Sequence, residues 1–64
     1  MIIVMKPGAP MQECEKIKNG LIDSGFQINE IVGVNMTILG VIGDTSTVDI
    51  NLLRVNDWVE TVSY

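Results

Sequence analysis

The chain has 64 residues, of which 47% are hydrophobic, and it carries a formal net charge of −4. This length allows one small domain with a marginal core, and the apolar fraction is too high for a disordered segment. The apolar runs fall far short of the ~20 residues that span a bilayer, and no signal peptide precedes the first run, so no membrane partner is expected. The negative charge argues against binding to nucleic acid.

The first two expected elements are a strand and a helix. Residues 1–5 (MIIVM) form a continuous apolar run, which suits a central strand covered on both faces. Two prolines and a glycine in residues 6–10 end that strand in a turn. From residue 11 to 24 the apolar positions recur with helical spacing, and Gly25 is expected to end the helix. The buried stripe consists of Met11, Cys14, Ile17 and Leu21, with Ile22 as a further candidate.

A pair of strands is expected next. In residues 26–32, Phe26 and Ile28 alternate with Gln27, Asn29 and Ile31, and the polar content suggests a strand at the edge of a sheet. Residues 33–35 (GVN) offer a hairpin turn. Residues 36–43 (MTILGVIG) are almost wholly apolar and predict a buried strand that returns along the first one.

A second helix and a last strand complete the chain. Residues 45–47 offer helix caps, and Ser46 and Asp49 have the spacing of a capping box. The expected buried stripe of this helix contains Val48 and Leu52, with Leu53 and Val55 as further candidates. Residues 58–64 are expected to form a strand that alternates, with Trp58, Glu60 and Val62 on one side and Val59, Thr61 and Ser63 on the other.

This order of elements predicts an α+β protein of the ferredoxin-like βαββαβ type, with residues 1–64 as a single domain. The fold is a four-stranded antiparallel sheet, and its first and third strands are central because they are the most apolar. Right-handed crossovers place both helices on one face of the sheet.

The predicted fold leaves the other face of the sheet bare. The central strands are apolar on both sides, so the bare face would expose either Ile38 and Ile42 or their neighbours Leu39 and Val41. An apolar patch of that kind marks an interface. The alternative is that both sides simply enlarge a very small core; we favour the interface.

Few residues in the chain can carry chemistry. There is no histidine, and one cysteine, Cys14, cannot form an internal disulfide, a metal site or an iron–sulfur site. The central strands lack the aromatic side chains on which an RNA-recognition module stacks bases. The one arginine, Arg54, lies too late in the chain for acylphosphatase-like anion binding. We therefore expect no catalytic residue, metal or cofactor in this chain, and a reducing cytoplasm as its location.

Three segments carry a family resemblance that extends over essentially all 64 residues. MIIVMKPG at the start, TILGVIGD after the glycine hairpin and WVETV near the end resemble the N-terminal ferredoxin-like domain of one class of DAHP synthase (3-deoxy-7-phosphoheptulonate synthase). That enzyme is a transferase that joins phosphoenolpyruvate to erythrose 4-phosphate at the start of the shikimate pathway.

The resemblance implies a regulatory role in aromatic amino acid biosynthesis. In the family this module precedes a catalytic TIM barrel, which carries the divalent metal, and mediates feedback inhibition by binding an aromatic amino acid between paired modules. By this resemblance the chain is an N-terminal fragment of a longer TIM-barrel enzyme and is not catalytic itself.

The resemblance also suggests effector-binding residues. Effector-binding members present a histidine and a serine on the second strand, where this sequence has Asn29 and Ile31. Asn29 keeps a hydrogen-bonding side chain and Ile31 does not, which argues against tyrosine and leaves another effector, such as a prephenate-like molecule, or none. In the expected hairpin register these two residues share the helix-free face with Ile38 and Gly40. Two copies that stack through this face would form a homo-oligomer with a pocket at Gly40. Alternatively, Gly40 serves only a bulge or close strand packing, and the chain is a ligand-free oligomerisation module.

Overall fold

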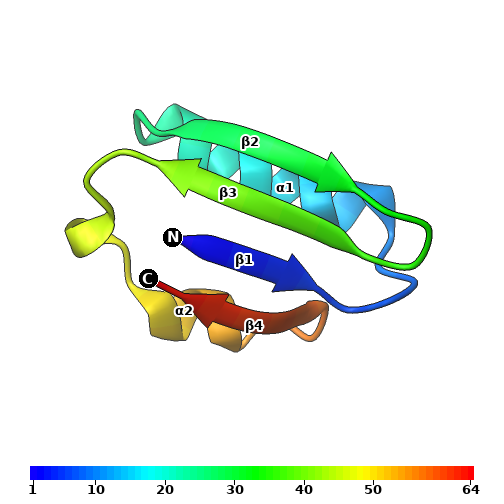
Figure 1. Ribbon diagram of the computed structural model, residues 1–64. Helices are drawn as coiled ribbons and strands as arrows, with labels where there is room; N and C mark the ends of the chain where they lie inside the picture. Colours follow the sequence, from blue (N-terminus) through cyan, green and yellow to red (C-terminus); the bar gives the residue numbers. More distant parts are fainter.

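A computed structural model describes residues 1–64 and confirms the predicted ferredoxin-like fold (Figure 1). The sheet has four antiparallel strands in the order β2-β3-β1-β4, so β1 and β3 are central and β2 lies at an edge. A single 3₁₀ turn, η1, precedes the second helix. The elements are β1 (Ile2–Met5), α1 (Met11–Asp23), β2 (Gln27–Val32), β3 (Thr37–Ile42), η1 (Thr45–Thr47), α2 (Ile50–Arg54) and β4 (Val59–Ser63).

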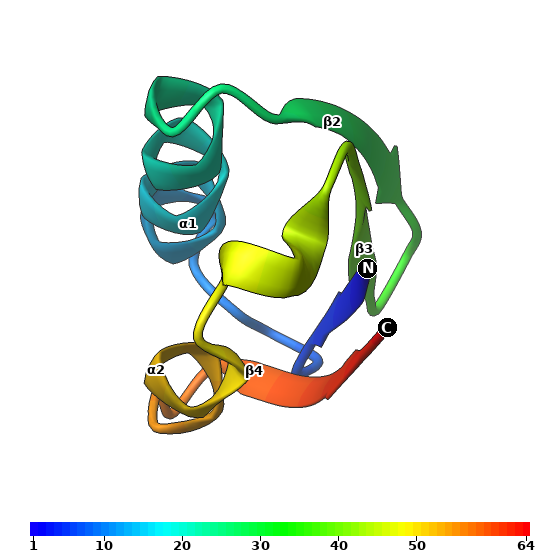
Figure 2. The ribbon, with the colours of Figure 1, turned by 90° about the vertical axis from the view of Figure 1, so that its left-hand side faces the viewer.

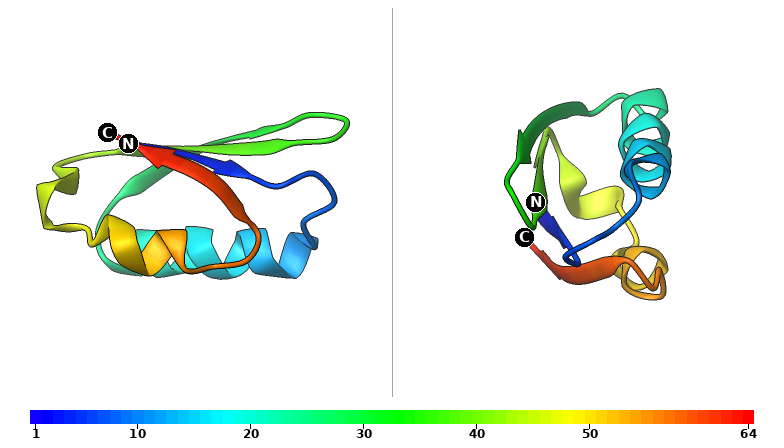
Figure 3. Two further views of the ribbon diagram at one scale, coloured as in Figure 1. Left: turned by 90° about the horizontal axis from the view of Figure 1, so that it is seen from below. Right: turned by 90° about the vertical axis from the view of Figure 1, so that its right-hand side faces the viewer.

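Both helices lie on the same side of the sheet (Figures 2 and 3). The core lies between the helices and the sheet, where burial of apolar surface stabilises the fold. It contains eight buried side chains: Ile3, Met5, Cys14, Leu21, Leu39, Val41, Val59 and Val62. Neither helix is long and apolar enough to cross a membrane.

The proline and glycine between β1 and α1 determine the type of turn that joins them. The Ala9 N–H donates to the Lys6 carbonyl at 3.1 Å, and Gly8 has a φ of +80°. A proline followed by a residue with positive φ is the signature of a type II turn. Pro10 then takes the N-cap position of α1 with an extended backbone. Gly25, with a φ of +98°, follows the end of α1 as predicted.

The hairpin between β2 and β3 has the predicted register. Asn29 pairs with Gly40, and Ile31 pairs with Ile38. The Gly33 N–H donates to the Met36 carbonyl at 2.7 Å and closes the loop. No residue other than glycine has a positive φ, so this is not the type I′ turn that an asparagine often forms in a hairpin.

The buried stripe of α1 is narrower than predicted. Cys14, Ile17 and Leu21 pack against the core, but Met11 and Ile22 are exposed. Met11 lies in the first turn of the helix, outside the packed core. Ile22 follows Leu21 by about 100° around the helix axis and so points away from the sheet.

The second helix is shorter than predicted because two aspartates divide the segment. Asp44 accepts hydrogen bonds from the N–H and the hydroxyl of Ser46, at 3.1 and 2.7 Å, and caps η1. Asp49 accepts from the Asn51 N–H at 2.9 Å and caps α2 separately. The Ser46–Asp49 capping box is therefore wrong, because Ser46 donates back to Asp44 instead.

The division of this segment also changes which side chains are buried. Val48, Ile50 and Leu53 pack against the core, whereas Leu52 and Val55 are exposed. The prediction for Leu52 and Val55 is wrong because a helix of five residues makes little more than one turn. Its sheet-facing positions are taken by Ile50 and Leu53.

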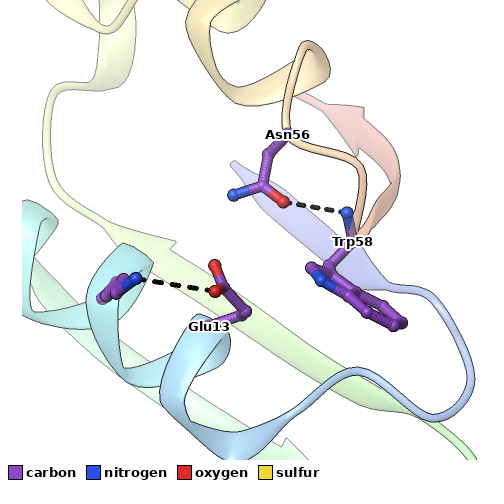
Figure 4. A network of polar contacts seen from close by, with 4 residues as sticks. Glu13, Asn56 and Trp58 are labelled. Carbon is purple, nitrogen blue, oxygen red and sulfur yellow. Dashed lines mark hydrogen bonds and ion pairs between the residues drawn. The ribbon is translucent and has the colours of Figure 1, made fainter.

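The alternation predicted for the last strand holds for Thr61, Val62 and Ser63 but is wrong for Val59. Val4 pairs with Thr61, but Met5 pairs with Val59, so Glu60 is the extra residue of a β-bulge. The bulge lets Val59 and Val62 both enter the core, although they were expected on opposite sides. Figure 4 shows the turn before the strand, where the Asn56 side-chain oxygen accepts from the Trp58 N–H at 2.8 Å.

Candidate functional site: the open face of the sheet

The sheet face without helices, here called the open face, contains two rows of paired residues. One row crosses all four strands as Asn29, Gly40, Ile2 and Ser63. The second row, two residues further along, consists of Ile31, Ile38, Val4 and Thr61. Residues that face one another across antiparallel strands lie on the same side of the sheet. The pairing therefore makes each row a continuous strip.

The open face is apolar and carries no charge in either row. Ile31 and, beyond the rows, Ile42 are each 55% exposed, and Ile2 is exposed as well. In a strand with one face in water, polar residues normally alternate with apolar ones. β2 shows this alternation only in part. The helices of the same chain cannot cover this surface, because both lie on the other side (Figure 3).

Gly40 forms a gap in the first row. Its pairing with Asn29 and with Ile2 is regular, so it is not part of a bulge. A Cβ atom at this position would lie 3.5 Å from the Asn29 carbonyl oxygen, an ordinary van der Waals contact. Neither strand geometry nor packing therefore requires a glycine here. The missing side chain leaves a notch between Asn29 and Ile2.

The structure brings the four predicted effector-binding residues together. Asn29, Ile31, Ile38 and Gly40 form a two-by-two block on the open face. The Asn29 amide makes no hydrogen bond within the chain and is free for a ligand or a partner.

The remaining residues of the two rows, from β1 and β4, were not predicted as site residues. Ile2 and Val4 could have been found, because they alternate with the buried Ile3 and Met5. Thr61 was expected on the side opposite Val62, but the bulge at Glu60 hid which face either residue takes.

Hollows and perturbed ionisable groups lie away from the open face. Two hollows of about 450 and 290 Å³ are lined by residues beside α1 and α2. The hydrogen bonds from Ser46 lower the pKa of Asp44, in the turn after β3. Glu15 and then Glu30 raise the pKa of Lys18 on α1. No three ligating side chains are close enough to hold a metal ion. The open face of a single copy is therefore a neutral surface with one notch and no enclosed pocket.

Comparison with known proteins assigns the family. The sequence model of the DAHP synthase ferredoxin-like domain matches residues 1–64. The chain belongs to this family. No curated protein matches the chain. The crystal structure of phospho-2-dehydro-3-deoxyheptonate aldolase (DAHP synthase) from Thermotoga maritima is similar to this ferredoxin-like domain, with a TM-score of 0.81 and 27% identity. The match covers 94% of this chain but 18% of that enzyme, so the domain spans about a fifth of the enzyme's length.

Proposed function

We propose that this ferredoxin-like domain is the regulatory module of a DAHP synthase and senses an aromatic amino acid or a prephenate-like effector by pairing with a second copy. The observation that supports this proposal is the open face, which is apolar and uncharged and is notched at Gly40. A contiguous apolar surface of this kind favours association.

The catalytic work belongs, in this proposal, to another part of the parent protein. The module aligns with 18% of the Thermotoga maritima enzyme, which leaves room for a TIM barrel of the usual ~250 residues. The module would be the N-terminal part, and the barrel would carry the reacting groups and the divalent metal. It would therefore not condense phosphoenolpyruvate with erythrose 4-phosphate by itself. A cytoplasmic location is part of the same proposal.

Pairing would create the effector pocket. Two open faces stacked on each other would bury Ile31, Ile38 and their neighbours and would turn the shallow notch at Gly40 into an enclosed space. The free amide of Asn29 can donate and accept hydrogen bonds at the edge of that space. An effector enclosed there would contact both copies, so effector binding and association would strengthen each other by the same factor.

The alternative is an oligomerisation module that binds no effector. Neither row of the open face carries a charged side chain to meet the ammonium and carboxylate of an amino acid. In this alternative the open faces pair through apolar contact alone, and Gly40 only flattens the surface.

Sedimentation velocity at several protein concentrations tests the pairing. We expect reversible association that phenylalanine, tyrosine or prephenate strengthens. Ile38→Asp should abolish association, because it places a charge in the centre of the interface. Leu52→Asp is the matched control, since Leu52 is 71% exposed on α2, away from the open face. A chain that stays monomeric at millimolar concentration with every ligand would contradict the proposal.

Gly40→Ala separates the two functions. A Cβ atom fits at this position, so the fold and ligand-free association should persist. If the notch receives an effector, the variant should lose the effector's influence on association at least tenfold. If the effector acts equally on both proteins, the notch is not its site.

A further inference from the structure

The two edges of the sheet differ in how well they are protected against a further strand. β4, at one edge, is interrupted by the bulge at Glu60, which disturbs the spacing of its backbone groups. β2, at the other edge, is six residues long, and its register with β3 is regular from Gln27 to Val32. No other element lies beyond β2 (Figure 1). Bulges and short strands protect an edge from pairing, and β2 has neither feature.

The pairing with β3 determines which backbone groups of β2 remain free. The Gly33 N–H donates to the Met36 carbonyl at 2.7 Å, so Gly33 turns its backbone groups toward β3. In an antiparallel pair this direction alternates along the strand. Ile28, Glu30 and Val32 therefore turn their N–H and carbonyl groups outward. These three residues, here called the β2 edge, offer both donors and acceptors to an added strand.

A stripe of α1 lies beside the β2 edge and is not used by the core. Met11, Glu15, Lys18 and Ile22 fall within roughly 60° of one another around the helix axis. Lys18 reaches Glu30 at 3.6 Å, so this stripe lies on the β2 side of the helix. Met11 is 76% exposed and Ile22 is 47% exposed, although both were expected in the buried stripe. A strand added to β2 would cover them.

A hollow of about 450 Å³ lies between this stripe and the end of β2. Met11 and Glu15 line it from α1, and Glu30 and Val32 line it from β2. Glu30 pairs with the buried Leu39, so its side chain lies on the helix side of the sheet, and Val32, two residues further on, lies there as well. Because side chains alternate along a strand, every second side chain of an added strand would face this hollow.

The charge beside the β2 edge distinguishes between possible partners. Glu15 and Glu30 share one ammonium, that of Lys18, at 3.4 and 3.6 Å, which leaves an excess of negative charge. A second copy of β2 has no basic residue and carries its own Glu30, so self-pairing would bring like charges together. A strand with a lysine or arginine at the matching position would balance the excess instead.

We propose that the β2 edge binds an extended segment of another protein as a fifth strand. The backbone of the segment pairs with Ile28, Glu30 and Val32. On the helix side, a central basic side chain of the segment faces Glu30, and an apolar side chain on either side of it covers Met11 or Ile22. In this mode main-chain hydrogen bonds supply affinity, and alternate side chains supply specificity. The site needs one copy of the chain and does not rest on the proposed pairing through the open face.

Titration with the peptide TVTKTVT, blocked at both ends, tests the chemistry of the partner. Its sequence reads the same in both directions and places a lysine between two valines on one side. We expect saturable binding that protects the amide hydrogens of Ile28, Glu30 and Val32 from exchange. The amides of Asn29 and Ile31 already face β3 and should change little.

The peptide TVTETVT is the matched control for charge. It should bind roughly tenfold more weakly, because its glutamate meets the excess of carboxylate beside the β2 edge. Equal binding of the two peptides, or binding without the alternating protection of the β2 amides, overturns the proposal.

Two variants test the edge and its charge. Val32→Pro removes an outward N–H and spares the bonds to β3, so it should abolish peptide binding without unfolding the chain. Val32→Ile is the matched control, since it keeps the N–H and an apolar side chain. Glu30→Lys should reverse the preference, so that TVTETVT binds more tightly than TVTKTVT. Circular dichroism checks that each variant is folded. Unchanged binding in folded Val32→Pro, or an unchanged preference in Glu30→Lys, contradicts the assignment.

Ile38→Asp separates this site from the open face. Binding of TVTKTVT should persist in this variant, whether or not the unmodified chain pairs. If folded Ile38→Asp loses the peptide, the peptide lies on the open face, and the proposal for the β2 edge fails while the proposed function is unaffected. If the amides of the β2 edge gain protection as the concentration of the chain rises without peptide, a second copy fills the edge, which also overturns the proposal.

Discussion

The two faces of the sheet contain similar residue types but differ in what covers them. Along β3, Leu39 is fully buried under the helices, whereas its neighbour Ile38 lies on the open face and Ile42 is 55% exposed. The helices therefore decide which apolar residues stabilise the single module. The apolar residues of the open face contribute less to its folding and are available for contact with another molecule.

The largest expected difference between the faces is in stability. Leu39→Ala removes a fully buried side chain and should lower the free energy of unfolding by about 2–5 kcal/mol. Ile38→Ala, on the next residue but the other face, should cost about 1 kcal/mol or less. Urea or thermal unfolding of both variants measures the difference. Equal losses would mean that the open face belongs to the folding core of the module.

A second pair of variants applies the same comparison to the helices. Leu21→Ala, on the buried stripe of α1, should cost on the order of 2–4 kcal/mol, and Leu52→Ala, exposed on α2, should change stability by less than about 0.5 kcal/mol. Circular dichroism during thermal unfolding provides both values. A substantial loss in Leu52→Ala would show that α2 packs more tightly than its exposure indicates.

Two glycines of the β3 segment distinguish a structural from a functional position. Gly43 has a φ of +133°, and a Cβ atom there would lie 3.0 Å from the Phe26 ring. Gly43→Ala should therefore cost roughly 1–2 kcal/mol. Gly40→Ala should stabilise the strand by up to about 1 kcal/mol, because alanine loses less backbone entropy than glycine. Chemical unfolding would contradict this contrast if Gly40→Ala were the more damaging change.

The smallest expected effect concerns Asp44, in the turn after β3. Hydrogen bonds from the Ser46 hydroxyl and N–H hold the pKa of Asp44 below its usual range. A lowered pKa in the folded state stabilises the fold above the unfolded value of about 4, and this contribution is lost as the pH falls through the folded pKa. Ser46→Ala should raise the pKa of Asp44 towards its ordinary value, as an NMR titration of the carboxyl carbon would show. An unchanged pKa would assign the shift to the backbone hydrogen bond alone.

The sequence predicts most of the fold and the arrangement of the open face. Alternation in β2, a short hairpin loop and apolar central strands were enough to place Asn29, Ile31, Ile38 and Gly40 on one face. These features are local, or they depend on a two-residue period that a short loop fixes. Whether a segment forms a strand or a helix is likewise predicted from the local spacing of its apolar residues.

The remaining features depend on tertiary packing that a pattern does not reveal. The bulge at Glu60 arises where β4 adapts to β1, and it brings Val59 into the core on the same side as Val62. The division between η1 and α2 depends on the competition between two aspartate caps, Asp44 and Asp49. The exposure of Met11 depends on how the first turn of α1 sits against the sheet, which the helical pattern does not reveal.

The strand order also affects how the domain folds during synthesis. β1 precedes the other elements in the chain, yet its neighbours in the sheet are β3 and β4, whose partner residues lie more than 30 and more than 50 positions later. While the ribosome makes the intervening residues, the apolar β1 has neither partner. Such non-local pairings slow folding and leave an unpaired strand open to misassociation. The nascent chain is therefore most vulnerable until β3 emerges, and the sheet is complete only when β4 has been made.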